Sequence, residues 1–171
     1  MYKGVIQNIP DWCRHLYIKG IVHKEFVPTG QTVNSGFYCE VLQRLRENVR
    51  RHRPQLWREQ TWPLHHDNAP SHTSVLTHQF LAKNKIAVNP HPPYSPDLAP
   101  HYFYLFQKLK LKLKGRRFDT IEEIQAKLQR VLDTLTEKDF HEAFQKWRRR
   151  IWCLHVGGNY FEGDGGRLAL W

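Results

Sequence analysis

Cysteine is scarce in this sequence, and long apolar runs are missing. The three cysteines, Cys13, Cys39 and Cys153, lie far apart and include no Cys-x-x-Cys pair. This spacing disfavours a disulfide framework or a zinc site, so we expect a reducing compartment. No stretch reaches the roughly 18 apolar residues that span a membrane, and the N-terminus lacks the apolar core of a signal peptide. The sequence therefore predicts an intracellular protein with no membrane partner.

Acidic residues are also few. The chain has 16 Asp and Glu against 26 Lys and Arg, which gives a formal net charge of +10. A summed positive field attracts polyanions whatever their sequence, so a nucleic-acid partner is one interpretation and a merely soluble basic surface is the other. With 171 residues, 40% of them hydrophobic and 13% aromatic, the chain is predicted to form one globular domain.

The first third of the chain predicts a hairpin followed by a helix. Residues 21–27 are β-rich and lie between a glycine and a Pro-Thr-Gly turn, which is typical of a strand. Its partner in the hairpin should lie around residues 16–18. Apolar side chains at helical spacing from Phe37 to Val49 predict a helix that carries several arginines in its C-terminal half.

The middle of the chain predicts two short strands around one helix. The strands are expected at residues 62–66 and 86–88, and the helix, with its apolar side chains over residues 75–81, is expected to begin after Ser71 as its cap. Residues 90–100 then hold five of the ten prolines. Because proline fixes φ and restricts the residue before it, this segment should be a stiff, extended connector and not a helix.

The last third predicts three helices. Residues 109–114 alternate leucine with lysine, which is typical of a strand, but leucine also recurs at every fourth position over residues 105–113. Gly115 follows where a helix would end, so we favour a helix. Capping patterns and apolar stripes predict two more helices over residues 120–135 and 136–150.

Two motifs in the middle of the chain carry a specific resemblance. Residues 65–70 read His-His-Asp-Asn-Ala-Pro, and residues 93–100 read Pro-Tyr-Ser-Pro-Asp-Leu-Ala-Pro. With shorter matches in the same order from Leu16 to Arg167, they resemble the catalytic core of mariner transposases, within the Tc1/mariner superfamily. The resemblance implies an α/β, ribonuclease H-like fold of the DDE transposase/integrase superfamily, with an N-terminally truncated mixed sheet flanked by helices.

The resemblance also divides the chain. Residues 1–15 are unlike the family, residues 16–167 form the expected catalytic domain, and residues 168–171 are a tail. The match leaves out the family's paired helix-turn-helix units and the segment with its first catalytic aspartate. That segment is normally the central strand, so the resemblance implies a gap in the sheet, which residues 4–9 would fill poorly.

The family cuts and joins DNA with divalent metal ions held by three carboxylates, which implies Mg²⁺ as the cofactor. The resemblance places the second carboxylate at Asp67 and the third at position 102, which is Tyr102. A neutral phenol is a poor magnesium ligand, and Asp67 alone is a weak one that would equally cap the turn after it. We therefore predict that Mg²⁺ is not productively bound and that the chain is catalytically inactive.

Alternatives to an inactive transposase domain stay open. A substitute carboxylate, such as Asp97 or Asp164, would make the chain an active metal-dependent nuclease or transposase. A further alternative is a protein-interaction module or a translated remnant, whose exposed sheet edges could pair with other chains. A histidine metal site is another hypothesis, although the spacing of the histidines matches no zinc pattern. These histidines are His65, His66, His72 and His91.

Basic residues form the predicted DNA-binding surface, because they can contact phosphates without reading bases. They are Lys108, Lys110, Lys112, Lys114, Arg116 and Arg117 in one run, and Arg148, Arg149 and Arg150 in another. A solvated helix face accounts for them about as well, and the resemblance to a DNA-processing family favours binding. We expect non-specific DNA binding and a location in the nucleus, with a homodimer as an open alternative.

Overall fold

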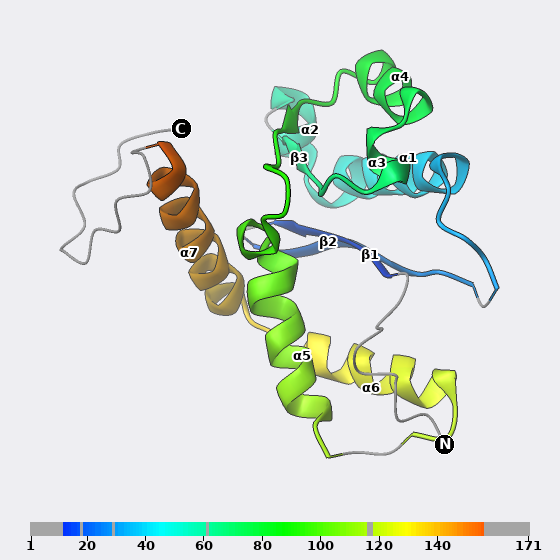
Figure 1. Cartoon of the computed structure of the whole chain (residues 1–171), viewed down its shortest axis with the longest axis vertical. Coiled ribbons are helices and arrows are strands. Elements are labelled where there is room, and N and C mark those ends of the chain that lie inside the picture. Colours follow the sequence, from blue (N-terminus) through cyan, green and yellow to red (C-terminus); the bar gives the residue numbers. More distant parts are fainter. Residues whose placement is uncertain (1–11, 18, 29, 61, 116–117, 156–171) are drawn as a thin grey trace.

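The structure, a computed structural model, describes residues 12–17, 19–28, 30–60, 62–115 and 118–155. Helices predominate, and two short pairs of strands lie among them (Figure 1). None of the helices within these residues is long and apolar enough to span a membrane. The fold is mixed α/β and rich in helix, in agreement with the predicted class.

The first pair of strands is an antiparallel hairpin. Strand β1 (Trp12–Tyr17) pairs with β2 (Gly20–Phe26), which confirms the hairpin predicted from the sequence. Gly20 has a φ of 131°, in the region that favours glycine, so it allows the chain to enter β2 directly from the tight turn.

Helix α1 (Ser35–His52) follows the hairpin and confirms the first predicted helix. The Asn34 side chain accepts a hydrogen bond of 2.9 Å from the backbone N–H of Phe37, which satisfies one of the unpaired donors at the helix N-terminus. Helix α2 (Pro54–Glu59) begins at a proline, whose missing N–H costs nothing at the first helical position. The buried side of α1 consists of Tyr38, Val41, Leu42, Leu45 and Val49.

The second pair of strands is parallel and very short. Strand β3 (Leu64–His65) pairs with β4 (Val88–Asn89), so both strands form where the sequence predicts them. Each has two residues and is shorter than the expected segments 62–66 and 86–88. The difference arises because a strand extends only as far as its neighbour can pair with it.

Two helices connect β3 to β4. Helix α3 (Pro70–Thr73) is a single turn, and α4 (Val75–Lys83) follows it directly. The prediction that Ser71 caps the longer helix is wrong, because Ser71 lies within α3. Ser74 has an extended backbone that separates the two helices, and its Oγ accepts a hydrogen bond of 3.1 Å from the N–H of Thr77.

The proline-rich connector is extended only in part. It contains a 3₁₀ turn, η1 (Pro96–Leu98), so the prediction of a wholly non-helical segment is wrong at its C-terminal end. A π-helical turn, η2 (His101–Leu105), then leads directly into α5 (Phe106–Leu113). Gly115, with a φ of 76°, lies just past α5 and confirms the predicted helix and its end.

The last two helices also follow the prediction. Helix α6 (Ile121–Asp133) is capped by Thr120, whose Oγ1 accepts a hydrogen bond from the next turn, and α7 (Glu137–His155) follows it. At the start of α7, Asp139 Oδ2 accepts a hydrogen bond of 2.8 Å from the N–H of Thr136. Helix α7 is longer than expected, because it continues past the arginines at positions 148–150.

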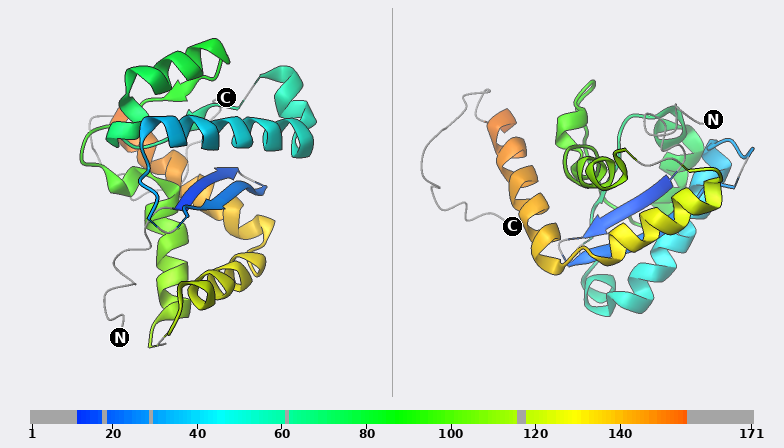
Figure 2. Two further views of the ribbon diagram at one scale, coloured as in Figure 1. Left: turned by 90° about the vertical axis from the view of Figure 1, so that its right-hand side faces the viewer. Right: turned by 90° about the horizontal axis from the view of Figure 1, so that it is seen from below.

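The hairpin separates two hydrophobic cores. In the left view of Figure 2 it lies between α1 on one side and α5 with α6 on the other. We call the first set of buried residues the α1 core and the second the α5 core. The α1 core consists of Tyr38, Leu42, Leu45, Val49, Leu64, Leu81 and Ile86. The α5 core consists of Leu105, Leu109, Leu113, Leu128, Val131 and Leu132.

A β-bulge lets strand β2 serve both cores. Leu16 lies opposite Ile21, but the residue before Leu16 lies opposite His23, so Val22 is an extra residue in β2. Val22 packs against the α1 core, and His23 accepts a hydrogen bond of 2.8 Å from Asn48 Nδ2 of α1. Ile21 instead packs against the α5 core. The bulge therefore gives two consecutive side chains to the α1 side.

Within the described residues, the two pairs of strands form separate sheets that share no hydrogen-bonded strand. A separation of this kind is what the predicted gap in the central part of the sheet would produce. Residues 4–9, the weak candidates for filling that gap, lie outside the described residues.

Candidate functional site

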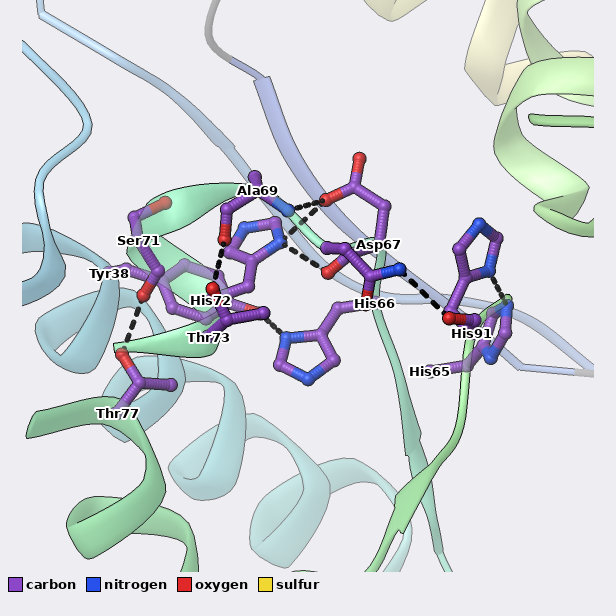
Figure 3. Close-up of polar contacts among 11 residues, drawn as sticks. Tyr38, His65, His66, Asp67, Ala69, Ser71, His72, Thr73, Thr77 and His91 are labelled. Atoms are coloured by element: carbon purple, nitrogen blue, oxygen red, sulfur yellow. Dashed lines mark hydrogen bonds and ion pairs between the residues drawn. The ribbon is translucent and has the colours of Figure 1, made fainter. Parts of the chain in front are cut away.

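Asp67 lies two residues after the end of β3, where the chain turns toward α3. Its Oδ1 accepts two hydrogen bonds, one of 3.0 Å from the N–H of Ala69 and one of 2.8 Å from Nδ1 of His72 (Figure 3). The first of these bonds closes a short turn two residues long, as Asp side chains commonly do. Asp67 thus has the turn-capping role that the sequence leaves open as an alternative to metal binding.

The contacts of Asp67 fix its charge. The hydrogen bond from His72 holds the pKa of the Asp67 carboxyl well below its usual range, against the opposing effect of burial. The Ala69 N–H and the charge of His101 lower the pKa further. Asp67 is therefore ionised at neutral pH, and His101 lies near enough to act on it.

Tyr38 of α1 organises the histidines beside Asp67. Its hydroxyl donates a hydrogen bond of 3.1 Å to Nδ1 of His66, and its ring centroid lies 4.0 Å from that of His72. Burial lowers the pKa of His66 to about 4, so His66 is neutral at pH 7 and can accept this bond. The sequence alone indicates no site role for Tyr38, because Tyr38 stands among the apolar residues of a core-facing helix.

His65 and His91 form a second histidine pair. His91 Nδ1 and His65 Nε2 are 3.3 Å apart, and Asn68 Nδ2 donates a hydrogen bond of 2.9 Å to the carbonyl of His91. The His65 ring also lies 5.2 Å from the ring of Trp147, which belongs to α7. These contacts join β3 to the proline-rich connector and to α7.

The four predicted histidines therefore form two pairs with different partners. His66 and His72 lie together, with ring centroids 5.0 Å apart, while His65 pairs with His91. Across the part of the chain that the structure describes, no group of three or more His, Cys, Asp or Glu side chains is arranged to hold a metal ion.

Tyr102, at the predicted position of the third carboxylate, lies in the π-helical turn η2. Its side chain is 43% exposed, and its ring centroid lies 4.5 Å from that of His101 and 5.4 Å from that of Phe106. His101, the residue before Tyr102, lowers the pKa of Asp67 through its charge. Position 102 is thus occupied by an aromatic ring, next to a residue that acts on Asp67.

The described donors do not fit a pair of magnesium ions. Such a pair needs several hard oxygen ligands, ideally carboxylates that approach from different elements. Asp67 Oδ1 already accepts two hydrogen bonds, and Tyr102 offers a phenol that is neutral at pH 7. The substitute candidate Asp97 lies in η1, where its carbonyl accepts a bond of 2.5 Å from Arg150 Nη1, and Asp164 lies outside the described residues.

The predicted basic residues differ in what surrounds them. Lys108 forms an ion pair with Asp139, and the Arg150 guanidinium lies 4.0 Å from the ring centroid of Phe103. These two side chains therefore help to join α5 and α7 to their neighbours. Two others, Arg116 and Arg117, lie outside the described residues. The exposed ones are Lys110 and Lys112 on α5, Lys114 just after it, and Arg148 and Arg149 on α7.

The two basic runs do not form one surface. Figure 1 shows α5 and α7 diverging, with α5 running toward α6 and α7 running away from it. Lys110 and Lys112 lie in the C-terminal part of α5 and Lys114 directly follows it, whereas Arg148 and Arg149 lie in the second half of α7. A single straight ligand would therefore contact one run or the other.

The layered helices and the aspartate at the end of a parallel strand define a ribonuclease H-like domain of the DDE transposase class. A family model described as transposase (partial DDE domain) matches residues 17–59. The crystal structure of the catalytic domain of Mos1 mariner transposase matches with a TM-score of 0.77 and 30% sequence identity, over 88% of this chain and 75% of that one. The chain belongs to the mariner transposase family.

Two curated relatives match the same extent of the chain. The Mos1 transposase of Drosophila mauritiana is 32% identical over 148 residues, which are 84% of this chain and 42% of that protein. The histone-lysine N-methyltransferase SETMAR of Homo sapiens is 29% identical over 148 residues, or 84% of this chain and 21% of that protein. The family and fold implied by the two sequence motifs are thus confirmed, and the chain spans less than half of either relative.

Proposed function

We propose that this chain is a mariner catalytic domain that neither cuts nor joins DNA and that retains sequence-independent DNA binding. The observation that carries the first part is the aromatic contact of Tyr102 with His101 and Phe106 at the position of the third carboxylate. A side chain that is committed to ring contacts and carries no charge cannot replace a carboxylate ligand.

The chemistry of the relatives defines what this chain would have to supply. Catalytic-domain structures of Mos1 transposase have been determined with Mg and with Mn. When bound, such ions activate the attacking oxygen and stabilise the leaving one. In this chain Asp67 is ionised but accepts hydrogen bonds from Ala69 and His72, so its role is to close a turn and to orient His72.

The second part of the proposal rests on exposed positive charge. Mos1 transposase has been determined in a paired-end complex with the left transposon end. Among the described residues, no ion pair engages Lys110, Lys112 or Lys114, which leaves their charges for phosphates. We expect dissociation constants of about 10⁻⁴ to 10⁻⁶ M at physiological salt, the range of non-specific DNA binding. A location in the nucleus is part of the same proposal, and a homodimer would bring two such surfaces together.

Plasmid nicking tests the loss of catalysis. We expect no nicking of supercoiled DNA with Mg²⁺ or Mn²⁺, either by the wild-type chain or by Tyr102→Asp, because Asp67 and one restored carboxylate are fewer than the three carboxylates that the resemblance implies. Asp67→Ala serves as the control for contaminating nuclease. Nicking by the wild-type chain that disappears in Asp67→Ala would show that the site is active and that a substitute ligand exists.

Salt-dependent binding tests the retained affinity. Replacing Lys110 and Lys114 with Gln should weaken binding equally for all sequences and reduce the salt slope by about 0.9 for each lost phosphate contact. A matched variant with Gln at Lys83 and Lys85, at the end of α4, removes the same net charge. Equal effects of the two variants would show that α5 has no special role and that only net charge matters.

A further inference from the structure

A stripe of aromatic and basic side chains runs along one side of η2 and α5. Tyr102, Phe106, Lys110 and Lys114 follow one another at intervals of four residues, which places them on one face of a helix. The neighbouring face holds the helix in the domain, because Leu105, Leu109 and Leu113 are all buried in the α5 core. The stripe is therefore carried on a rigid, anchored element.

The N-terminal end of the stripe is an aromatic platform. The ring centroids of Tyr102, His101 and Phe106 form a triangle: Tyr102 lies 4.5 Å from His101 and 5.4 Å from Phe106, and His101 lies 6.3 Å from Phe106. The π-helical turn accounts for this arrangement, because the N–H of Phe106 bonds to the carbonyl of His101, five residues earlier. With 43% of its surface exposed, Tyr102 still offers part of its ring to a ligand.

The C-terminal end of the stripe is positively charged. Lys110 and Lys114 are exposed, in contrast to Lys108 two residues before Lys110, whose charge is paired with Asp139. From Tyr102 to Lys114 the stripe is about 18 Å long, at the usual rise of a helix. This length accommodates a few nucleotides, with rings at one end and charges at the other.

We propose that this stripe binds single-stranded DNA, with an unpaired base on Tyr102 and Phe106 and the neighbouring phosphates on Lys110 and Lys114. The inference rests on the proposed DNA binding and adds that single-stranded DNA is the preferred ligand. Aromatic rings stack on any exposed base, which gives affinity without sequence preference, whereas in a duplex the neighbouring base pairs cover these faces. Together, an exposed ring and lysines that form no ion pair within the described residues favour a strand with free bases over duplex DNA.

Fluorescence anisotropy on the full chain tests this preference. The probes are a labelled oligo(dT) of about 12 nucleotides and a blunt duplex of the same length, within the site sizes of single-strand binding proteins. We expect tighter binding of oligo(dT), and a loss of about tenfold for Tyr102→Ala on oligo(dT) but not on the duplex. Tyr102→Trp should keep the affinity. Tyr94→Ala is the matched control, because Tyr94 is fully exposed outside the stripe.

Photo-crosslinking gives a second readout that does not depend on a variant folding. An oligonucleotide with 5-iodouracil in place of one thymine should crosslink to Tyr102 or Phe106 in the wild-type chain, as identified by mass spectrometry. Crosslinks confined to other residues would overturn the inference.

The outcomes separate this inference from the proposed function. Equal binding of both probes, unchanged in Tyr102→Ala, would leave DNA binding in place and refute the single-strand site. A chain that binds neither probe would refute both. Tighter binding of an oligo(U) of the same length than of oligo(dT) would refute the assignment to DNA.

Discussion

Asp67 and Tyr102, the two positions that the resemblance assigns to the site, are held in different ways. Asp67 is fixed by its own turn, through hydrogen bonds from Ala69 and His72. Tyr102 is exposed and is held by ring contacts with His101 and Phe106, its neighbours on the same helix. An aspartate at position 67 therefore has a structural role without any metal, whereas a carboxylate at position 102 would have had no such hydrogen-bonded turn.

The two positions also depend on different cores. Tyr38 of the α1 core contacts both histidines beside Asp67, so packing and polar contacts act together there. Leu105 of the α5 core anchors the turn that carries Tyr102, but Tyr102 itself points out of the core. Around Asp67, stability should consequently depend strongly on the Asp67 side chain itself. Around Tyr102, it should depend more on Leu105, which supports the turn, than on the Tyr102 side chain.

The largest effect is expected from removing the support of the turn that carries Tyr102. Leu105→Ala should lower the free energy of unfolding by about 2 to 5 kcal/mol, because Leu105 is fully buried and the substitution leaves a cavity. Urea unfolding followed by circular dichroism measures this change. The control Leu111→Ala, at a position 73% exposed, should change it by less than about 0.5 kcal/mol. Similar losses in both variants would show that the α5 core does not support η2.

The next largest effect is expected from acid, which should lower the stability of the region around Asp67. Since the pKa of His66 is lowered to about 4 by burial, the folded state resists a proton that the unfolded state takes up near the usual histidine pKa of 6.5. The contribution of His66 to the free energy of unfolding is thus fully present above pH 6.5. It is lost as the pH falls toward 4, by about 1 to 3 kcal/mol.

The variant His66→Asn keeps an acceptor for Tyr38 and removes the titration, so its stability should depend less on pH within that interval. Asp67, whose pKa is depressed by His72, loses its contribution only below its usual value of 3.8 and serves as an internal reference. An unchanged pH dependence in His66→Asn would assign the effect to other buried histidines, of which His23 and His65 also have lowered pKa values.

Neutralising Asp67 should have an intermediate effect. Asp67→Asn keeps an oxygen for the N–H of Ala69 but loses the charge-assisted bond from His72, which should cost about 1 to 2 kcal/mol in thermal or urea unfolding. Asp97→Asn is the matched control, since Asp97 is exposed in η1 and should change stability by less than about 0.5 kcal/mol. If neither variant changes the free energy of unfolding, the turn is held by its backbone alone.

The smallest effect is expected at Tyr102. Tyr102→Ala should cost less than about 1 kcal/mol, because an exposed ring loses only part of its contact area and two ring contacts. Tyr94→Ala, with no such contacts among the described residues, gives the baseline. A loss greater than that of Asp67→Asn would reverse the comparison and make Tyr102 the structural residue of the site.

Features set by neighbouring residues could be predicted from the sequence. The caps Asn34, Thr120 and Thr136 lie within three residues of their partners and could be read from local patterns. The cap at Ser71 was predicted wrongly because Ser74 offers the same hydroxyl three residues later, and an extended backbone there decides between them. The family and the positions of both motifs also follow from short, contiguous segments.

Features set by distant residues could not be predicted. The bond between Tyr38 and His66 joins positions 28 apart, and the ion pair between Lys108 and Asp139 joins positions 31 apart. Nothing in a linear pattern indicates which of several histidines or lysines such a partner selects. For the same reason Lys108 and Lys110 look equivalent in the sequence, although within the described residues only Lys108 forms an ion pair.

The β-bulge in β2 has a consequence for the gene as well as for the protein. A codon deleted from an ordinary strand position would exchange the faces of all the side chains on one side of the deletion. Deleting the codon for Val22 would instead restore a regular strand, with Ile21 still facing the α5 core and His23 still facing Asn48. Natural length variation in this strand should therefore concentrate at position 22.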